Sequence, residues 1–230
     1  INGGPWLAPT VAGPPDYIFD NLSQGTYNIN VRDSYGCEGT AVPITINPQL
    51  NASATIQSDL TCLVDASIEV NATGGSGTYA YEWSNLATGP WNNTQFTGNI
   101  FTTNTAGTFF FRVTDTTAPI ACADIVGPIT VNPPATPIIT SVTPTDILCN
   151  GESTGSLDVV INTAIGNPPY VIDVLEINGP TNYGTQTTGL PAGDYEVTIT
   201  DDNGCPSAPF AVSIAEPNAI VPNVTNTNLT

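Results

Sequence analysis

Histidine, lysine and methionine are absent from the 230-residue sequence, and its only basic residues are Arg32 and Arg112. Without histidine and lysine, the Ser-His, Cys-His and lysine-based catalytic arrangements are excluded, which leaves an enzyme only carboxylate chemistry. Against two arginines stand 20 acidic residues, so the formal net charge is −18. Such a surface repels phosphates and anionic headgroups, and we predict neither nucleic acid nor a membrane surface as a partner.

Charged residues and long apolar runs are both scarce. Only 10% of the residues are charged, whereas glycine and proline each occur 21 times, which is typical of β-strands joined by turns. No stretch approaches the roughly 18 consecutive apolar residues that span a bilayer, and residues 1–20 lack the basic start and apolar core of a signal peptide. We expect no membrane insertion in this segment, and any secretion signal to lie outside it.

One phrase occurs three times, at residues 25–33, 107–115 and 193–201. Each copy begins with Gly, ends with Asp and alternates apolar with polar residues, which predicts a strand with one buried face. A turn and a second short strand follow each copy. Each copy is therefore predicted to form, with the strand after it, a β-hairpin at the C-terminal end of its domain. The copies are a domain length apart, which indicates tandem small domains rather than a solenoid of short repeats.

Prolines after these hairpins, at Pro48, Pro133 and Pro217, are natural joints because proline cannot donate to a ladder. About seven short strands in each full unit predict an antiparallel Greek-key sandwich. We therefore predict an all-β chain of tandem immunoglobulin-like Greek-key β-sandwich repeats, arranged as an extended rod on the order of 100 Å long. The predicted divisions are the C-terminal part of a truncated repeat (1–48, the first repeat), two full repeats (49–135, the second, and 136–218, the third) and a linker or start of another (219–230).

Aromatic residues fall into two groups. Tyr27, Phe109 and Tyr195 occupy the same position of the repeated phrase and are predicted to face the core. Residues 190–195 have the shape of a tyrosine corner, in which the hydroxyl bonds to upstream backbone, a bond that Phe109 cannot make. Trp83 ends an alternating aromatic strand and is predicted to be the core tryptophan of a sandwich.

The other two tryptophans suggest an alternative function. Trp6 and Trp91 each follow a Gly-Pro pair in a loop, where an exposed ring could contact a ligand. An exposed aromatic row of this kind would make the chain a carbohydrate-binding β-sandwich module of a secreted protein. Buried rings would count against that alternative.

The five cysteines fit the repeat frame. Cys62 and Cys149 precede the first core strand of a full repeat, and Cys122 and Cys205 follow its last turn, so we predict the disulfides Cys62–Cys122 and Cys149–Cys205. Each should stabilise its repeat by about 4 kcal/mol in the chain-entropy model, and disulfides imply an oxidising, extracellular location. Cys37 is predicted to be unpaired because its repeat is truncated. Zinc or a catalytic thiol is disfavoured, since there is no His and no Cys-x-x-Cys.

Turn aspartates raise the question of calcium. Asp33, Asp115 and Asp201 recur at equivalent turns, but no Asp-x-Asp-x-Asp loop surrounds them. The pair Asp201-Asp202 could in principle act as in a glycosidase, but a short hairpin turn more often uses Asp to accept backbone N–H groups. We predict no catalytic residue, no metal site and no cofactor, with calcium as the alternative, and we predict that the chain is not an enzyme.

Residues 149–159, the pair Pro169-Tyr170 and residues 189–205 resemble the SprB repeats of very large surface adhesins in gliding bacteria that use type IX secretion. The resemblance is strong in the third repeat, partial in the first and looser in the second, where the segment from Asp115 to Cys122 is longer.

The resemblance implies a structural stalk segment of a filamentous cell-surface adhesin that supports surface attachment and gliding motility. It implies neighbouring repeats as partners, and further a surface polysaccharide or substratum and the motility or secretion machinery. Such bacteria also O-glycosylate Asp-Ser/Thr followed by an apolar residue or Thr, so Asp115-Thr116-Thr117 makes Thr116 a candidate acceptor.

Overall fold

The computed structural model describes residues 17–117, 122–179 and 181–223. Strands, turns and loops make up these residues, which contain no helix, and hence none that could cross a membrane. The prediction of an all-β chain is confirmed. The chain forms two compact units: unit 1 comprises residues 1–57, 67–102 and 107–130, and unit 2 comprises residues 58–66, 103–106 and 131–230.

The first repeat contributes one antiparallel hairpin to unit 1. Its strands are β1 (Gly25–Ile29) and β2 (Val42–Ile46), paired from Gly25 opposite Ile46 to Ile29 opposite Val42. Tyr27 is half-buried, whereas Val42 and Ile44 are exposed to solvent.

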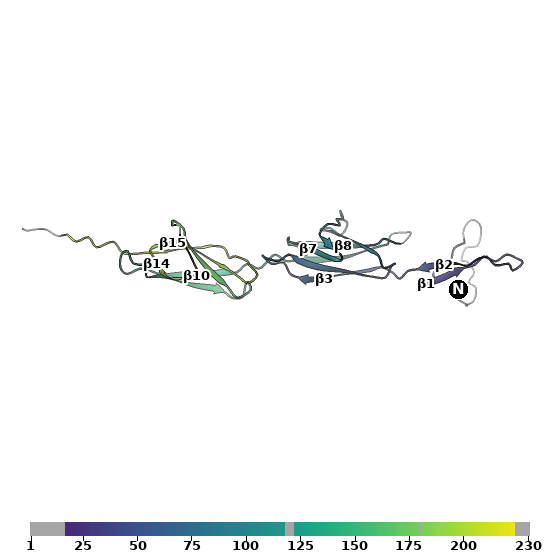
Figure 1. Ribbon diagram of the computed structural model, residues 1–230, viewed down its shortest axis with the longest axis horizontal. Coiled ribbons are helices and arrows are strands. Elements are labelled where there is room, and N and C mark those ends of the chain that lie inside the picture. The colour runs from purple at the N-terminus through teal and green to yellow at the C-terminus, as the bar shows by residue number, and fades with distance from the viewer. Residues whose placement is uncertain (1–16, 118–121, 180, 224–230) are drawn as a thin grey trace, which may run out of the picture. The chain divides into compact units, whose positions relative to one another are not determined.

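The second repeat forms two sheets. One contains four strands in the order β3-β4-β7-β6 and the other three in the order β5-β8-β9, which is the arrangement of a constant-type immunoglobulin sandwich. Figure 1 shows β3, β7 and β8 of this sandwich. The strands are β3 (Asn51–Ser58), β4 (Ala66–Thr73), β5 (Tyr79–Ser84), β6 (Phe96–Thr97), β7 (Ile100–Thr103), β8 (Gly107–Asp115) and β9 (Ala123–Val131).

Aromatic rings fill the core of the second repeat. β8 alternates buried and half-buried positions, as the period of two predicts, so that Phe109, Phe111 and Val113 all face inward. Phe101 of β7 is fully buried, and its ring centroid lies 5.2 Å from those of both Phe109 and Phe111. Burial of each such side chain stabilises the fold by about 1.5–3 kcal/mol.

The third repeat forms the same sandwich with one strand moved. Its sheets have the orders β10-β11-β14 and β13-β12-β15-β16, so the fourth strand, β13, pairs with β12 rather than with the sheet of the first strand. β10, β14 and β15 are labelled in the green part of Figure 1. The strands are β10 (Ile138–Thr145), β11 (Gly155–Asn162), β12 (Val171–Glu176), β13 (Asn182–Gly184), β14 (Thr188–Leu190), β15 (Gly193–Thr200) and β16 (Phe210–Ile214).

An aliphatic core with one tyrosine holds this repeat together. Tyr195, Val197 and Ile199 alternate along β15 and are fully buried, and Val174 and Leu190 pack with them from β12 and β14. The two sheets are therefore joined by side chains from every second position of their strands.

Seven strands give the third repeat two distinct ends. The successive strands β10 and β11, β12 and β13, and β15 and β16 pair antiparallel, and β14 and β15 run antiparallel to β11 and β12, respectively. A hydrogen bond from Ile147, just after β10, to Ala215, just after β16, places the ends of these two strands together, so successive strands reverse direction. Because the number is odd, the first strand begins at one end of the sandwich and the last strand finishes at the other. We call these the leading end and the trailing end of a repeat, and the functional residues divide between them.

Candidate functional site at the ends of the repeats

A tight turn with a cysteine lies at the leading end of the third repeat. Gly204 N–H donates to Asp201 O at 3.0 Å, and Asp201 N–H donates to Cys205 O at 3.1 Å. The Asp201 carboxylate accepts the Cys205 N–H at 2.8 Å and, with its other oxygen, the Asn167 N–H at 3.0 Å. Gly204 has φ +72°, a conformation that favours glycine and explains the Asn-Gly pair of the sequence.

The first repeat contains the same turn. Gly36 N–H donates to Asp33 O at 3.1 Å, and the Asp33 carboxylate accepts the Cys37 N–H at 2.9 Å. Cys37 and Cys205 therefore occupy equivalent positions in equivalent hydrogen-bonded turns, as the repeated phrase predicts.

The second repeat has a longer version. Asp115 N–H donates to Cys122 O at 2.9 Å, and the buried Asp115 carboxylate accepts hydrogen bonds from the hydroxyl and the N–H of Ser76 and from the Thr117 N–H at 3.1 Å. The bonds from the Ser76 hydroxyl, the Ser76 N–H and the Thr117 N–H lower the pKa of Asp115 below its ordinary value.

These turn aspartates hold the backbone in place. Asp33, Asp115 and Asp201 each accept at least two hydrogen bonds through their carboxylates, and in each case a backbone N–H is among the donors. Over the residues that the structure describes, no three His, Cys, Asp or Glu side chains gather into a metal-binding group. In this geometry the three carboxylates accept the N–H groups of their own turns, which is the turn role that the sequence predicts.

The trailing end of the third repeat is a loop that holds the departing chain. Ile147 N–H donates to Ala215 O at 2.9 Å, and Ala215 N–H donates in return to the Asp146 carboxylate at 2.8 Å. The Asn150 side-chain amide donates to Pro217 O at 3.1 Å, and Gly151 N–H donates to the Glu216 carboxylate at 2.7 Å. Cys149 lies in the middle of this loop and is exposed.

Cys62 occupies the corresponding loop between β3 and β4. It follows Asp59, a buried Leu60 and Thr61, as Cys149 follows Asp146, a buried Ile147 and Leu148. The loop of residues 58–66 belongs to compact unit 2. Its Leu63 side chain lies against Gly204, where an added Cβ would come within 2.3 Å of Leu63 Cγ.

The disulfide pairing differs from the sequence prediction. Cys62 is bonded to Cys205, with Cα atoms 5.1 Å apart and a sequence separation of 143 residues. Cys122 and Cys149 are exposed free thiols, and so is Cys37. The predicted disulfides Cys62–Cys122 and Cys149–Cys205 are therefore wrong in this structure.

The reason is the odd number of strands. Cys205 lies at the leading end of the third repeat and Cys149 at its trailing end, so β15 separates them by about 25 Å at 3.3 Å per residue. A disulfide requires Cα atoms within about 7 Å. The same separation applies to Cys122, beyond the end of β8, and Cys62, between β3 and β4. The repeats in the sequence correctly place the four cysteines in two kinds of loop. The predicted pairs are wrong because they join cysteines of the same repeat, whose two loops lie at opposite ends of the sandwich.

The predicted core aromatics are placed as follows. The Tyr195 ring is fully buried and its hydroxyl donates to Pro191 O at 2.7 Å, and the Tyr27 hydroxyl donates to Ser23 O at 2.7 Å. Both bonds reach back four residues, as a tyrosine corner does. Burial, with nearby Tyr183 and Glu176, raises the pKa of Tyr195 to about 12. Phe109 is buried in the corresponding place without a hydroxyl.

Two further tyrosines, which the sequence analysis did not single out, also donate their hydroxyls to upstream backbone, here five residues away. The Tyr79 hydroxyl donates to Gly74 O, and the Tyr170 hydroxyl donates to Ile165 O at 3.1 Å. Both tyrosines follow a Gly- or Pro-rich cluster, immediately before or at the start of the third strand of a repeat. Comparing the repeats at this position would have revealed the pair.

The structure describes two of the three tryptophans, Trp83 and Trp91, and neither ring is fully exposed. Trp83 is half-buried, packs 5.3 Å from Phe101 and 5.8 Å from Phe109 between ring centroids, and donates to Thr94 O at 3.0 Å. Trp91 is half-buried, and the Arg112 guanidinium carbon lies 4.9 Å from the centroid of its ring. Trp6 lies outside the described residues.

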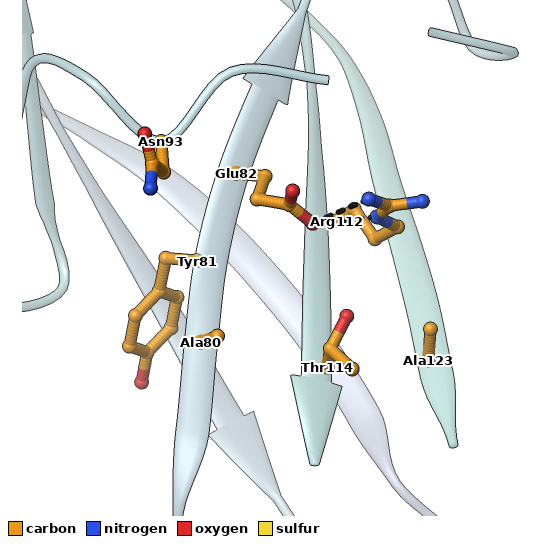
Figure 2. A pocket seen from close by; sticks show the side chains of 7 residues that line it. All are labelled: Ala80, Tyr81, Glu82, Asn93, Arg112, Thr114 and Ala123. Atoms are coloured by element: carbon orange, nitrogen blue, oxygen red, sulfur yellow. Dashed lines mark hydrogen bonds and ion pairs between the residues drawn. The ribbon is translucent and has the colours of Figure 1, made fainter. Parts of the chain in front are cut away.

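Arg112 belongs to a shallow hollow of about 440 Å³ on the sheet of β5, β8 and β9. Figure 2 shows its guanidinium beside the Glu82 carboxylate, and Arg112 Nε donates to Glu82 Oε2 at 2.7 Å. The pairing neutralises both charges, and Arg112 covers one face of Trp91. The charged side chains that line the hollow, Arg112 and Glu82, are thus paired with each other, and Tyr81 is its one aromatic lining residue among those that the structure describes.

Thr116 is exposed at the leading end of the second repeat. Its N–H donates to Thr78 O at 3.0 Å, and its hydroxyl donates to the same oxygen at 3.3 Å. The hydroxyl is thus at the surface and weakly held.

Comparison with protein families finds a match to the SprB repeat at residues 54–88. The match runs from β3 through β5, so it covers the trailing-end loop with Cys62 and the Trp83 strand, and it lies in the second repeat, where we found the looser resemblance. No curated protein matches the chain. The SprB repeat is a structural rather than an enzymatic repeat, it occurs in cell-surface and extracellular proteins, and it indicates a protein of the surface-adhesin type.

Proposed function

We propose that this chain, which carries a SprB repeat at residues 54–88, is a structural stalk segment of a filamentous cell-surface adhesin. In this proposal the repeats stand in series and hold an adhesive region away from the cell, where it supports attachment and gliding motility after type IX secretion. The family match is the observation that carries the proposal.

The strand topology supports a role as a spacer. The chain enters each seven-strand repeat at the leading end and leaves it at the trailing end, so each added repeat would lengthen the stalk. We propose an extended rod, and with about 35 Å for each repeat the described chain would measure on the order of 100 Å. Small-angle X-ray scattering of the purified chain should give a maximum dimension of this size, whereas a compact particle would contradict the rod.

The adhesin role is tested on cells. Antibodies against residues 49–218 should label intact cells, and labelling only after permeabilisation would contradict a surface location. An in-frame deletion of these residues from the parent gene should reduce attachment. Tracking the bound antibodies then tests the gliding role, since a gliding adhesin would move along the cell and a static surface protein would not.

The partners we propose are neighbouring repeats of the same chain, a surface polysaccharide or substratum, and the cell-surface motility or secretion machinery. We also propose Thr116 as an O-glycosylation site, because its hydroxyl is exposed in the sequence Asp115-Thr116-Thr117. Mass spectrometry of the chain from its native cells should show a glycan that Thr116→Ala removes, and an unmodified peptide would contradict the proposal.

A further inference from the structure

The bonded and unbonded cysteines occupy two repeated positions. The bonded pair joins the trailing-end loop of the second repeat, through Cys62, to the leading-end turn of the third, through Cys205. Cys149 lies in the trailing-end loop of the third repeat, and Cys37 and Cys122 lie at the leading-end turns of the first and second. All three are exposed, and each occupies the place of one member of the bonded pair.

We infer that Cys37, Cys122 and Cys149 are halves of further disulfides of the same kind, one at each junction between consecutive repeats. Cys149 takes the leading-end cysteine of a repeat that follows it, and Cys37 and Cys122 each take the trailing-end cysteine of a repeat that precedes them. The partner is thus another SprB-type repeat with the complementary cysteine. The inference rests on the tandem-repeat part of the proposed function and is independent of adhesion and gliding.

Two observations beyond the cysteines support this assignment. The turns of Cys37 and Cys205 share their backbone geometry, with the Asp carboxylate accepting the Cys N–H at 2.9 Å and 2.8 Å. At the trailing end, four hydrogen bonds hold residues 215–217 against the loop of Cys149. The departing chain, and hence a repeat that begins soon after it, is therefore held beside that thiol.

The bond forms by thiol–disulfide exchange with a small disulfide oxidant such as oxidised glutathione. The Cys149 thiolate attacks one sulfur of the oxidant and releases a thiolate, and the incoming cysteine then attacks the mixed disulfide at the Cys149 sulfur and releases the second. Two cysteines are oxidised, one oxidant disulfide is reduced to two thiols, and the protons of the cysteines pass to the released thiolates.

The test extends the chain by one repeat. The extended protein consists of residues 1–218 followed directly by a second copy of residues 136–218. The linker between β16 and the first strand of the added copy then has the same length as the linker between β9 and β10. The added copy is isotope-labelled and ligated to the unlabelled chain, so that its peptides differ in mass. After refolding in a glutathione buffer, non-reducing peptide mapping should find the unlabelled Cys149 bonded to the labelled Cys205 of the added copy. The Cys62–Cys205 bond of the same molecule reports that folding and oxidation have succeeded.

Matched variants locate the bond. Cys149→Ser should leave the added Cys205 reactive toward a thiol reagent, whereas Cys122→Ser should leave the new bond unchanged. A Cys149 that stays reduced while Cys62–Cys205 forms, or that bonds to Cys205 of its own repeat, would overturn the inference. This experiment does not measure cell attachment. A failure to form the bond would therefore contradict the inference without contradicting the proposed adhesin function.

Discussion

At the scale of single residues, polar groups aimed at the backbone fix the ends of each repeat. The Tyr195 and Tyr27 hydroxyls bond to carbonyls four residues upstream, and turn carboxylates such as Asp115 accept neighbouring N–H groups. A buried carbonyl or carboxylate that loses such a partner keeps its desolvation cost, so single polar substitutions here should have measurable effects.

Tyr195→Phe should lower the free energy of unfolding by about 1 kcal/mol, because Pro191 O loses its hydrogen bond. Its effect should also depend on pH. The pKa of Tyr195 is raised to about 12 from the value near 10 of an unfolded chain, so its contribution is complete below pH 10 and is lost as the pH rises toward 12.

Denaturant unfolding at a series of alkaline pH values measures this. The unchanged chain should lose stability steeply between about pH 10 and pH 12, and Tyr195→Phe should lose less over that window. Tyr35→Phe is the control, since Tyr35 is 93% exposed. Equal slopes for the unchanged chain and Tyr195→Phe would contradict the prediction.

Ser76→Ala should raise the pKa of Asp115 toward its ordinary value by removing the hydroxyl that contributes most to lowering it. A lowered carboxyl pKa contributes stability above the unfolded value near 4 and loses it as the pH falls through the folded value. Ser76→Ala should therefore be less stable at neutral pH and approach the unchanged chain in strong acid. NMR titration of Asp115 and denaturation against pH test this, and Ser76→Thr, which keeps a hydroxyl, should behave like the unchanged chain.

At the scale of strands and turns, the two full repeats share seven strands but place the fourth differently. β6 pairs with β7 in the second repeat, whereas β13 pairs with β12 in the third, with a shift in register. Both strands are three residues or shorter and lie at a sheet edge, where few hydrogen bonds decide the partner. The turns, in contrast, are tightly constrained by glycine.

Gly74→Ala should destabilise the second repeat by about 2–4 kcal/mol. Gly74 has φ +82°, and a Cβ there would lie 1.9 Å from Gln49 O, a backbone atom that cannot move without displacing the start of the repeat. Gly77→Ala is the matched control in the same turn. Its φ is +94°, but no atom lies within 4 Å, so only about 1–2 kcal/mol of backbone strain is expected. Thermal unfolding of both variants measures the difference, and equal losses would contradict the steric argument.

At the scale of the whole molecule, the sequence predicted more of the fold than of the covalent structure. Alternation in residues 107–115 and 193–201 predicted β8 and β15 and their buried faces, because a period of two leaves few alternatives. The cysteine positions also followed from the repeats. The pairing of the cysteines did not follow from the repeats. The partner of Cys205 depends on which end of a sandwich each loop occupies, and this is known only once the number and direction of the strands are known.

The disulfide Cys62–Cys205 should contribute about 5 kcal/mol in the chain-entropy model, because it closes a loop of well over 100 residues. Cys205→Ser should therefore lower the unfolding temperature clearly under non-reducing conditions. Cys149→Ser should leave it unchanged in the 230-residue chain, since Cys149 is exposed and unbonded. A similar loss in both variants would contradict the assignment of the bond.

The same disulfide also determines how the chain carries tension. A pulling force applied at the two termini passes from Cys62 through the disulfide to Cys205. The chain between these two cysteines, which are 143 residues apart in the sequence, therefore cannot be extended while the bond is intact. At roughly 3.5 Å per extended residue, about 500 Å of length becomes available only when that bond is reduced. Strands β4 to β15 thus lie outside the path of the load, and a stalk built this way would resist stretching with β3 and β16 while its cores stay folded.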